Sequence, residues 1–456
     1  MWFRRDLRLR DHPALAAAAA AGSVLPLFVV DERLMGPSGA SRRLFLLDSL
    51  RSLDGDLRAV GSRLHVRSGP PEQIVPVVAS EVGATSVHLS ADFAPYGSAR
   101  DERVGKALGE VPLVPTGSPY AVSPGRVMTG GGAPYQVFTA FYRAWLRHGW
   151  HPPSGSDPER IGWLSAPGED LPTALEPAGV RLPVSGERAA HRAWASFLDR
   201  RATYGEERDR PDLDSTSRMS PYLRFGAIHP RTLLADLDPD DEAFRRELAW
   251  REFYADVMHH RPDTVRAPFR PEFAALPVES GEEGWRRFDL WAEGQTGYPI
   301  VDAAMRQLLG EGWMHNRARM IAASFLVKDL HVAWQWGARH FLRHLVDGDL
   351  ASNHHGWQWV AGCGTDAAPY FRIFNPVSQG EKFDPAGDYV RRWVPELAAV
   401  EGSSVHRPWL LPPGAAPDYP DPMVDHAAER ALALAGYEEV KRAARGRQGK
   451  SKHGKS

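Results

Sequence analysis

Residues 347–359 read DGDLASNHHGWQW, in which two acids flank a glycine and an asparagine and a tryptophan follow. If the chain is helical after Leu350, Asn353 and Trp357 lie one turn apart on one face, so an amide and an indole can contact the same object. That object should be flat and aromatic, with a polar edge. The alternative interpretation is a turn at the two acids followed by a helix with ordinary aromatic core residues.

The preceding segment, residues 297–320, predicts two more helices. Apolar residues recur at helical spacing in its first half, and Gly310 is expected to end the first helix. The second helix is expected to begin near Trp313 and to place Trp313, Asn316 and Met320 on one face. A face that mixes an indole, an amide and a thioether is unusual for a plain hydrophobic core.

Together with the N-terminus, these motifs carry a family resemblance. The chain resembles the photolyase and cryptochrome family, and within it the bacterial class I DNA photolyases that repair cyclobutane pyrimidine dimers. The resemblance extends from the first residue to about Pro422. The matching motifs are MWFRRDLRLRDHPAL (1–15), GYPIVDAAMRQL (297–308), GWMHNRARM (312–320), DGDLASNHHGWQW (347–359) and TDAAPYFRIFNP (365–376).

Composition narrows the class of protein. A chain of 456 residues exceeds the length at which one core keeps growing, so two domains are expected. The net charge of −2 says nothing by itself about nucleic acid, because the placement of positive charge decides that. The single cysteine, Cys363, excludes an internal disulfide and a cysteine-ligated metal site, and we predict no metal. No stretch has the length of a membrane span or a signal peptide, so we expect a cytoplasmic, nucleoid-associated protein.

Strand and helix patterns alternate in the first part of the chain. Apolar runs typical of buried strands lie at 25–30, 64–66 and 87–89, and a helix is predicted over 42–58. Such alternation implies a parallel sheet covered by helices. We therefore predict an α/β, Rossmann-like domain over residues 1–125, and the resemblance implies that it binds an antenna chromophore.

The rest of the chain divides by composition. Residues 126–185 include a stretch rich in Pro, Gly and Ser, which suits a long connection between domains. Helical periodicity without strands then predicts an all-α domain over 186–440, and the resemblance makes it the FAD- and DNA-binding domain. Residues 441–456 are basic and are expected to form a disordered tail.

A hydroxyl-rich turn precedes a helix that should start at Ser220. Unpaired N–H groups at such a start can hold a phosphate, although an ordinary N-cap explains the residues equally well. The resemblance implies that this turn binds the FAD diphosphate, that Tyr204 lies against the cofactor and that Arg208 faces the DNA. The residues assigned to the diphosphate are Thr216, Ser217, Arg218, Met219 and Ser220.

Phe244, Glu247, Trp250 and Tyr254 recur at helical steps, so one helix face combines aromatic rings with a carboxylate. A lone Glu on such a face is usually solvated or paired with a neighbouring Arg. The resemblance implies instead a wall of the lesion pocket, in which Glu247 hydrogen-bonds a thymine edge and Trp250 packs on the flipped bases. Phe244 is expected on the flavin side.

By the same resemblance, Asn353 faces N5 of the isoalloxazine, and Asn at this position argues for repair over signalling. His354 and His355 stand where the family commonly has Asn-Gly, and we expect them to face outward. Arg319 is expected to pair with Asp347 or Asp349. The further cofactor contacts are Asn316, Arg319, Asp347, Gly348 and Asp349. The further contacts to the lesion or to DNA are Asn316, Arg317, Met320, Trp359 and Gln379.

Many family members reduce their flavin through three tryptophans. Trp357 and Trp334 match the first two positions and are assigned to electron transfer, whereas the third position falls near Gly281, with Trp285 as the nearest stand-in. Repair by an already reduced flavin does not need this chain.

The resemblance implies a lyase that splits cyclobutane pyrimidine dimers in UV-damaged DNA, by electron transfer from excited reduced FAD to a flipped-out dimer. It also implies an antenna, either 8-hydroxy-5-deazaflavin or methenyltetrahydrofolate, and a monomer with no obligatory protein partner. The main alternative is a cryptochrome-type blue-light photoreceptor without repair activity, and a third is a flavin electron-transfer protein. A recovery of thymine absorbance under blue light would distinguish repair from the other two.

Overall fold

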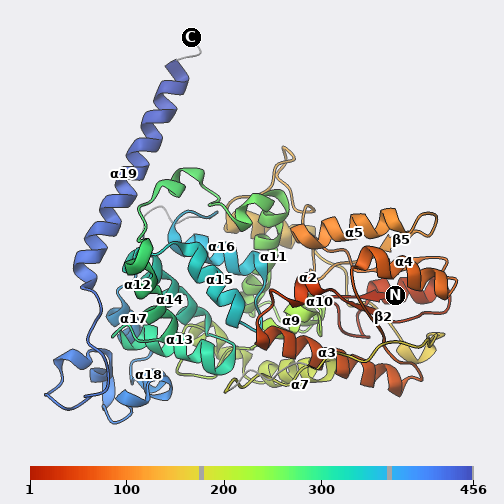
Figure 1. The fold of residues 1–456 in the computed structure, drawn as a ribbon, viewed down its shortest axis with the longest axis horizontal. Helices are drawn as coiled ribbons and strands as arrows, with labels where there is room; N and C mark the ends of the chain where they lie inside the picture. The colour runs from red at the N-terminus through yellow and green to blue at the C-terminus, as the bar shows by residue number, and fades with distance from the viewer. Residues whose placement is uncertain (174–178, 367–371, 454–456) are drawn as a thin grey trace. The chain divides into compact units, whose positions relative to one another are not determined.

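The computed structural model describes residues 1–173, 179–366 and 372–453 (Figure 1). The chain divides into two compact units, each of which is described by itself. Unit 1 comprises residues 1–205, 216–262 and 345–351, and unit 2 comprises residues 206–215, 263–344 and 352–456.

Unit 1 contains parallel sheets built from short strands. β1 (Trp2–Phe3), β2 (Leu27–Val30) and β3 (His65–Ser68) pair in that order, and β4 (Val87–Leu89) pairs with β5 (Leu113–Pro115). The helices between them are α1 (Pro13–Ala21), α2 (Glu32–Met35), α3 (Ala40–Ala59), α4 (Pro71–Glu81) and α5 (Pro95–Ala107). The predicted alternation of strand and helix around a parallel sheet is confirmed.

The core of this α/β part is apolar and joins the strands to α4 and α5. Every residue of β2 is buried, as expected for a strand covered on both faces. Trp2 and Leu27 from the sheet pack with Val75 of α4 and Val104 of α5. These contacts explain why the short apolar runs fold as inner strands.

The remaining helices of unit 1 are α6 (Phe138–His148), α7 (Glu187–Leu198), α9 (Ser220–Phe225), α10 (Pro230–Ala235) and α11 (Glu242–His260). Two of them hold the segment that follows β1. The Glu187 carboxylate accepts from the N–H of Leu9 at 2.7 Å, and the N–H of Leu7 donates to Phe225 O at 3.1 Å. Gly226 must be glycine, because a Cβ there would lie 2.0 Å from Arg5 O.

These helices lie in the same compact unit as the sheet, whereas the sequence assigns α6 to the connection and the other four to the helical domain. The domains predicted from the sequence are consecutive ranges, with boundaries after residues 125 and 185. These boundaries stay predictions. Part of the predicted connection, residues 174–178, lies outside the described residues. So do residues 367–371 of the motif at 365–376.

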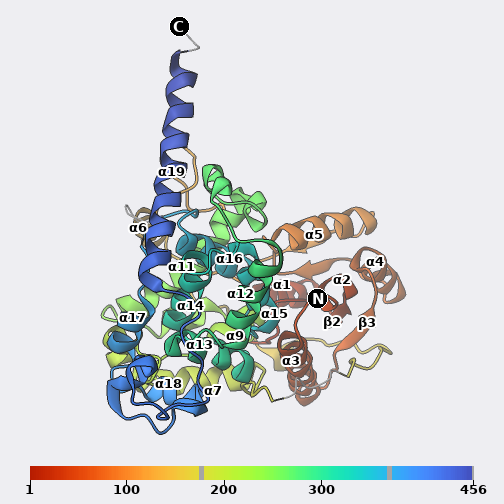
Figure 2. The ribbon, with the colours of Figure 1, turned by 60° about the vertical axis from the view of Figure 1, so that its left-hand side comes forward.

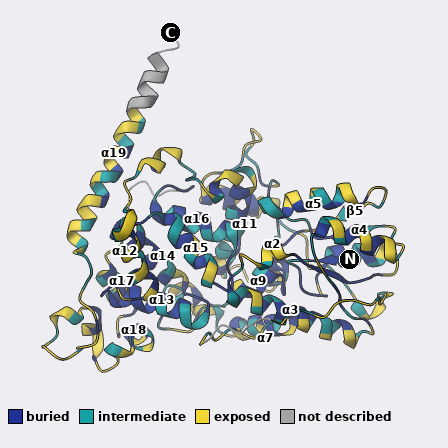
Figure 3. Cartoon of the chain, in the orientation of Figure 1, coloured by how far each residue is buried: buried dark blue, intermediate teal, exposed yellow. Residues whose placement is uncertain are grey.

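The described part of unit 2 consists of helices and loops, with an isolated bridge between Glu279 and Val332 in place of a sheet. α13 packs against α14 and α18, and most of its residues are buried (Figures 2 and 3). No helix among the described residues is long and apolar enough to cross a membrane. The helices are α12 (Gly281–Glu293), α13 (Pro299–Glu311), α14 (Asn316–Lys328), α15 (Trp334–His344), α16 (Leu350–Ala361, whose first two residues belong to unit 1), α17 (Pro376–Phe383), α18 (Asp388–Trp393) and α19 (His426–His453).

Short helical turns connect these elements. Of the chain's other helices, α8 (Tyr204–Glu207) crosses from unit 1 into unit 2. The 3-10 turns are η1 (Pro158–Arg160), η2 (Arg201–Thr203), η3 (Pro262–Val265), η4 (Pro271–Ala275), η5 (Pro395–Leu397), η6 (Gly402–His406) and η7 (Pro408–Leu410).

Two helix boundaries differ from the prediction. α13 continues past Gly310 and ends before Gly312, which takes the left-handed conformation (φ 58°) and donates its N–H to Leu308 O. Gly310 is instead a point of close approach, since a Cβ there would lie 2.9 Å from the Trp393 ring. α14 begins at Asn316, because His315 Nδ1 accepts from Arg317 N at 3.2 Å and caps the helix. Trp313 therefore precedes the helix and does not share its face.

The C-terminal tail also differs from the prediction. α19 runs to His453 and thus includes most of the stretch expected to be disordered. Ala433, Tyr437 and Val440 form its buried stripe, and Tyr437 stacks on Phe273 with ring centroids 5.2 Å apart. Ala, Glu, Arg and Lys favour helix, and no proline interrupts them after Pro422. Residues 454–456 lie outside the described residues.

Candidate functional site

Asn353 and Trp357 lie one turn apart on α16, as the sequence predicts. The amide nitrogen of Asn353 donates to the carbonyl oxygen of Ala338 on α15 at 2.9 Å, which fixes the orientation of its side chain. Asn353 is half-buried, whereas Trp357 is only 3% exposed. The pair therefore combines an oriented amide with a buried indole.

Trp357 packs directly against the backbone of α15. A Cβ on Gly337 would lie 2.1 Å from its ring, so only glycine fits there. Phe341 and Trp291 complete the cage, with ring centroids 4.9 and 6.1 Å away and both edge-on. No atom of the described residues accepts a hydrogen bond from the buried Nε1–H of Trp357. Native proteins seldom leave a buried polar atom without a partner, and a redox or catalytic role is one explanation when they do.

Trp334, the other tryptophan assigned to electron transfer, is also buried. Among the described residues, its ring contact is with His354, at 6.0 Å and edge-on. The prediction that His354 and His355 face outward is wrong, because both are buried. Burial, followed by the neighbouring His354, lowers the pKa of His355 to about 3, so its imidazole is neutral at physiological pH. No local pattern in the sequence indicated that both imidazoles are buried.

The start of α14 carries four of the predicted contacts. Asn316 is exposed and Met320 is half-buried. Arg317 pairs with Asp209 at 2.7 Å and lies 4.3 Å from the centre of the Phe383 ring. The ion pair brings the segment that contains Arg208 next to α14, so two residues assigned to DNA gather within unit 2.

Arg319, Trp359 and Gln379 complete the predicted residues of unit 2. The Nε–H of Arg319 donates to Met314 O at 2.7 Å, and pairing of Arg319 with an acid near residue 348 stays a prediction. Trp359 and Gln379 are half-buried. The amide oxygen of Gln379 is buried and accepts no hydrogen bond from the described residues, so it is a candidate ligand contact.

In unit 1, Tyr204 and Phe244 belong to one buried aromatic cluster. Their ring centroids lie 5.4 Å apart, and Phe197 packs 5.5 Å from Tyr204 and 5.0 Å from Phe244. Trp194 closes the cluster at 5.3 Å from Phe244. The structure thus brings together two residues that the sequence separates by a long stretch of chain.

Glu247 and Trp250 lie on the half-buried face of α11. The Trp250 ring stacks on Phe138 of α6, with centroids 3.7 Å apart and an angle of 7° between the planes. Phe138 gave no signal in the sequence, because it lies in the segment expected to be a plain connection. Its contact fixes one face of the indole that is assigned to the lesion.

The predicted diphosphate cradle is a compact turn. Arg218 adopts the left-handed conformation (φ 50°) and Met219 the right-handed one, an alternation that turns successive N–H groups to one side, as in anion-binding nests. The Met219 N–H is already used, because it donates to Ser217 Oγ at 3.3 Å. Met219 is buried, Thr216, Ser217 and Arg218 are half-buried, and Ser220 is exposed.

The acids around Gly348 are held by arginines. Arg5 pairs with Asp349 at 2.9 Å, and the Nε–H of Arg224 donates to Gly348 O at 2.9 Å. Burial, reinforced by the nearby Arg5, lowers the pKa of Arg224 to about 9. Burial lowers the pKa of Arg42, and the charge of the buried Asp347 opposes this shift.

The sequence patterns did not predict that Arg5 and Arg224 contact the residues around Gly348, although Arg5 lies within the N-terminal motif at 1–15. Arg5 and Asp349 are 344 positions apart, and nothing in the spacing of either motif indicates such a partner. The predicted cofactor and lesion residues divide between unit 1 and unit 2.

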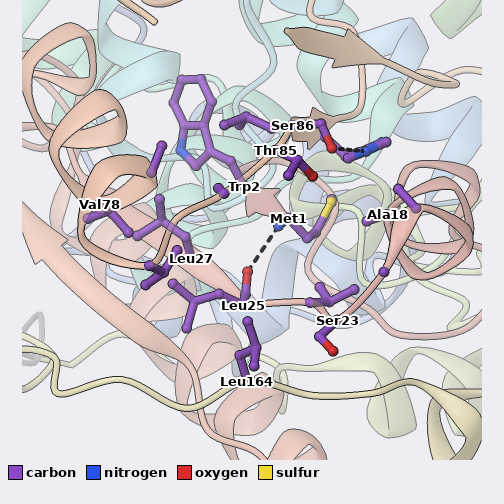
Figure 4. Close-up of a pocket in the computed structure, with 18 of the residues that line it drawn as sticks. Met1, Trp2, Ala18, Ser23, Leu25, Leu27, Val78, Thr85, Ser86 and Leu164 are labelled. Carbon is purple, nitrogen blue, oxygen red and sulfur yellow. Dashed lines mark hydrogen bonds between the residues drawn. The ribbon is translucent and has the colours of Figure 1, made fainter. Parts of the chain in front are cut away.

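A separate cavity of about 160 Å³ lies in the α/β part of unit 1 (Figure 4). Its wall combines Met1, Leu25 and Val78 with Ser86 and His88, and Ser86 Oγ lies 2.9 Å from His88 Nε2. Sites for drug-sized ligands usually measure roughly 300–1,000 Å³. This cavity is therefore too small for a folate or a deazaflavin.

Comparison with known proteins identifies two family models in the chain. The model for DNA photolyase matches residues 1–159, and the model for the FAD-binding domain of DNA photolyase matches residues 244–439. A curated relative, the deoxyribodipyrimidine photo-lyase of Streptomyces griseus, is 44% identical over 448 residues, which cover 94% of this chain and 96% of the relative.

Solved structures agree in fold along almost the whole chain. A class III photolyase from Agrobacterium tumefaciens superposes with a TM-score of 0.89 at 37% identity, covering 97% of each chain. An archaeal photolyase from Sulfolobus tokodaii, solved with two FAD molecules, has a TM-score of 0.86 at 31% identity, covering 96% of this chain and 99% of the other. A cryptochrome from Synechocystis has a TM-score of 0.85 at 29% identity, covering 95% and 97%.

Proposed function

Because the chain belongs to the photolyase and cryptochrome family, we propose that it is a light-driven lyase that repairs cyclobutane pyrimidine dimers in DNA with a bound FAD. The name of its Streptomyces griseus relative, a photo-lyase that is 44% identical over nearly the full length of both chains, supports repair of dipyrimidine lesions. The cyclobutane dimer is the finer part of the proposal. It is supported by Met320, because photolyases for (6-4) products usually have a pair of histidines in this helix, whereas here residues 315–320 read HNRARM.

The observation that carries the proposal is the arrangement of Asn353 and Trp357 on α16. The amide of Asn353 is fixed by Ala338 O, and the indole one turn later is buried with no acceptor for its N–H among the described residues. An oriented amide beside a dry, oxidisable ring suits a site that binds a flat redox cofactor. A buried indole N–H without a partner is uncommon in a plain hydrophobic core.

The residues present fit FAD by their chemistry. When bound, FAD supplies the one-electron photochemistry. We assign the diphosphate to the turn over residues 216–220, whose nest-like backbone and side-chain hydroxyls suit an anion. Asp347 and Asp349 are assigned to the flavin and its ribityl chain, and the pairing of Arg5 with Asp349 holds the side chain of this acid in place. Asn353 is assigned to the flavin edge.

The lesion is assigned to α11 and to the helices around Met320. Glu247 would accept a hydrogen bond from a thymine edge, and Trp250 would pack on the extruded bases, held flat by its stack on Phe138. A damaged pair stacks and pairs poorly, so its extrusion from the duplex costs less than that of a normal pair. This difference is a source of selectivity for damaged sites.

DNA phosphates are assigned to Arg208 and Arg317. Arg317 is paired with Asp209 in the structure, so a phosphate must replace or share this acid. Binding by such contacts releases counterions and weakens steeply with salt. We further propose that the protein acts as a monomer on nucleoid DNA in the cytoplasm.

We also propose an antenna chromophore, 8-hydroxy-5-deazaflavin or methenyltetrahydrofolate. The Sulfolobus tokodaii relative, solved with two FAD molecules, supports a second chromophore in this family. A visible spectrum of protein purified from its native host tests this assignment, because folate and deazaflavin absorb at different wavelengths. A spectrum that contains FAD alone would contradict it.

The function is tested by direct repair. Purified protein is loaded with FAD, reduced with dithionite under argon and mixed with UV-irradiated oligothymidylate. Under blue light, absorbance at the thymine band should recover, whereas the dark control should stay constant. A Glu247→Ala variant should repair more slowly than wild type, and an Arg160→Ala variant, at an exposed position outside the assigned site, serves as the matched control.

Failure of absorbance to recover, with FAD bound and reduced, would contradict the proposed repair and favour a cryptochrome-type photoreceptor. Irradiated oligonucleotide that contains (6-4) products in place of cyclobutane dimers tests the finer assignment. Repair of the (6-4) product with no repair of the dimer would contradict the choice of substrate.

A further inference from the structure

Arg246 lies on α11 one turn before Trp250, on the helix face that is assigned to the lesion. We propose that its guanidinium binds a phosphate of the damaged strand beside the extruded pair and holds the backbone while the bases pack on Trp250. This inference rests on the proposed function, because the pair must leave the duplex before the backbone can approach this face. It adds a phosphate contact in unit 1 to Arg208 and Arg317, which belong to unit 2.

Two aromatic side chains of α6 orient the Arg246 guanidinium. Its Cζ atom lies 5.1 Å from the centre of the Phe138 ring and 5.0 Å from the centre of the Tyr142 ring. Both rings are buried, so the core of unit 1 fixes their positions. A guanidinium within about 6 Å of a ring face is attracted to it and can stack on it. The charged end of Arg246 is therefore positioned before any ligand binds.

The same phenyl ring supports Trp250. The Trp250 indole stacks on Phe138 with centroids 3.7 Å apart, so the indole and the guanidinium rest against one ring. Residues four apart on a helix are neighbours on its surface. The sugar and phosphate of a nucleotide are joined directly to its base, so a base that packs on Trp250 brings its backbone towards Arg246.

The ion pair of Arg246 is weak enough to be replaced. Among the described residues, Arg246 pairs with Glu242, and the distance from Nη1 to the carboxylate is 4.0 Å. The same carboxylate accepts from the Tyr142 hydroxyl at 2.7 Å and from Arg245 Nη1 at 3.4 Å. Half-exposed pairs of this kind contribute little. A phosphate can therefore take the Arg246 guanidinium while Glu242 keeps its two closer donors.

Arg245, the preceding residue, has a different arrangement. Its guanidinium donates to Asp238 O at 2.6 Å and to Pro239 O at 3.4 Å, and its side chain is 13% exposed. These bonds hold the turn that precedes α11. The Arg246 side chain is 36% exposed, so it presents an open side to a ligand from solution. Of two adjacent arginines, one is used for the fold and the other is available for DNA.

Arginine suits this role chemically. Its planar guanidinium can donate two parallel N–H groups to phosphate oxygens. Contacts to phosphate set the position of a protein on DNA and do not read the sequence. Because this contact forms only when the pair is extruded, its free energy favours damaged over intact duplex.

The test measures binding of FAD-loaded protein in the dark, by fluorescence anisotropy over a range of salt concentrations. The two ligands are a duplex that carries one thymine dimer and the same duplex without it. The variants are Arg246→Gln and Arg246→Lys. Arg58→Gln is the matched control, because Arg58 is a 59% exposed arginine on α3 that pairs with Asp54 four residues earlier.

For the damaged duplex, Arg246→Gln should lower the slope of log affinity against log salt by about 1 and weaken binding at low salt roughly tenfold. Arg246→Lys should keep the slope, since the charge remains, but bind less tightly than wild type, since an ammonium does not stack on the rings. Arg58→Gln should match wild type on both duplexes. Arg246→Gln should match wild type on the intact duplex.

An unchanged slope for Arg246→Gln on the damaged duplex would overturn the proposal and leave Arg246 as a cover over the rings of Phe138 and Tyr142. An equal fall of the slope on the intact duplex would also overturn it, because the contact would then not depend on the extruded pair.

The proposed function is tested separately, by dimer splitting in the light. There Arg246→Gln should raise KM for the damaged duplex and leave kcat near the wild-type value, because a contact made throughout the reaction contributes uniform binding. Wild-type protein that binds the damaged duplex with the expected dependence on Arg246 but splits no dimer would contradict the proposed function and not this contact.

Discussion

Replacement of Gly337 by alanine should displace Trp357 and lower the stability of unit 2. The added Cβ would lie 2.1 Å from one ring atom and 2.6 Å from two others, and the ring cannot retreat because Phe341 and Trp291 enclose it. Overpacking of this kind costs about 1–3 kcal/mol. Glycine to alanine inside a helix otherwise gains about 1 kcal/mol, so the net free energy of unfolding should fall by up to roughly 2 kcal/mol.

Gly356→Ala is the matched control, because Gly356 lies inside α16 and nothing lies within 4 Å of an added Cβ. This variant should be as stable as wild type or more stable. Urea denaturation followed by near-UV circular dichroism compares the two, since the buried tryptophans dominate that signal. Gly337→Ala should unfold at lower urea than Gly356→Ala. Equal midpoints for the two variants would refute the packing of Trp357 on α15.

Three further predictions concern other parts of the chain. Burial raises the pKa of Glu252 from a reference value of 4.5 to about 7 in the folded protein. Hydrogen bonds from Trp145, Val122 and Ala121 lower this pKa, but their effect is smaller than that of burial. The folded state then binds this proton more tightly, so the contribution of Glu252 to stability is greatest below about pH 4.5 and falls by up to ~3 kcal/mol as the pH rises to 7. Glu252→Gln should flatten this part of a plot of unfolding free energy against pH, and an unchanged slope would contradict the assignment. Arg317→Gln should weaken binding to irradiated DNA and reduce the slope of log affinity against log salt by about 1, whereas an unchanged slope would remove Arg317 from the phosphate contacts. Removal of FAD should lower the free energy of unfolding by about 3–4 kcal/mol, relative to holoprotein with free FAD at 100–1,000 times its dissociation constant. Equal melting temperatures of the two forms would show that FAD does not bind the folded state.

Local patterns predicted the elements that local forces decide. The apolar run at 87–89 is β4, and the helix predicted over 42–58 is α3 with one or two more residues at each end. The spacing of Asn353 and Trp357 placed both on α16. In each case hydrophobic periodicity and turn residues within a few positions contain the information that the fold uses.

The features that the sequence missed depend on contacts between distant segments. Gly310 resembled a helix end, but its lack of a side chain serves the close approach of Trp393. Arg5 and Asp349 pair across 344 positions, and Phe138 stacks on Trp250 from a segment that read as a connection. His354 and His355 carry polar rings that no local rule places in the interior. Packing decided these cases, and local patterns in a sequence do not show which distant surfaces will meet.

The most decisive measurement is the number of thymine dimers that remain in irradiated oligothymidylate after blue light, with reduced, FAD-loaded protein. We predict that dimers disappear catalytically in the light and persist in the dark, and that Asn353→Leu slows their loss. Dimers that persist in the light while FAD is bound and reduced would contradict the central claim.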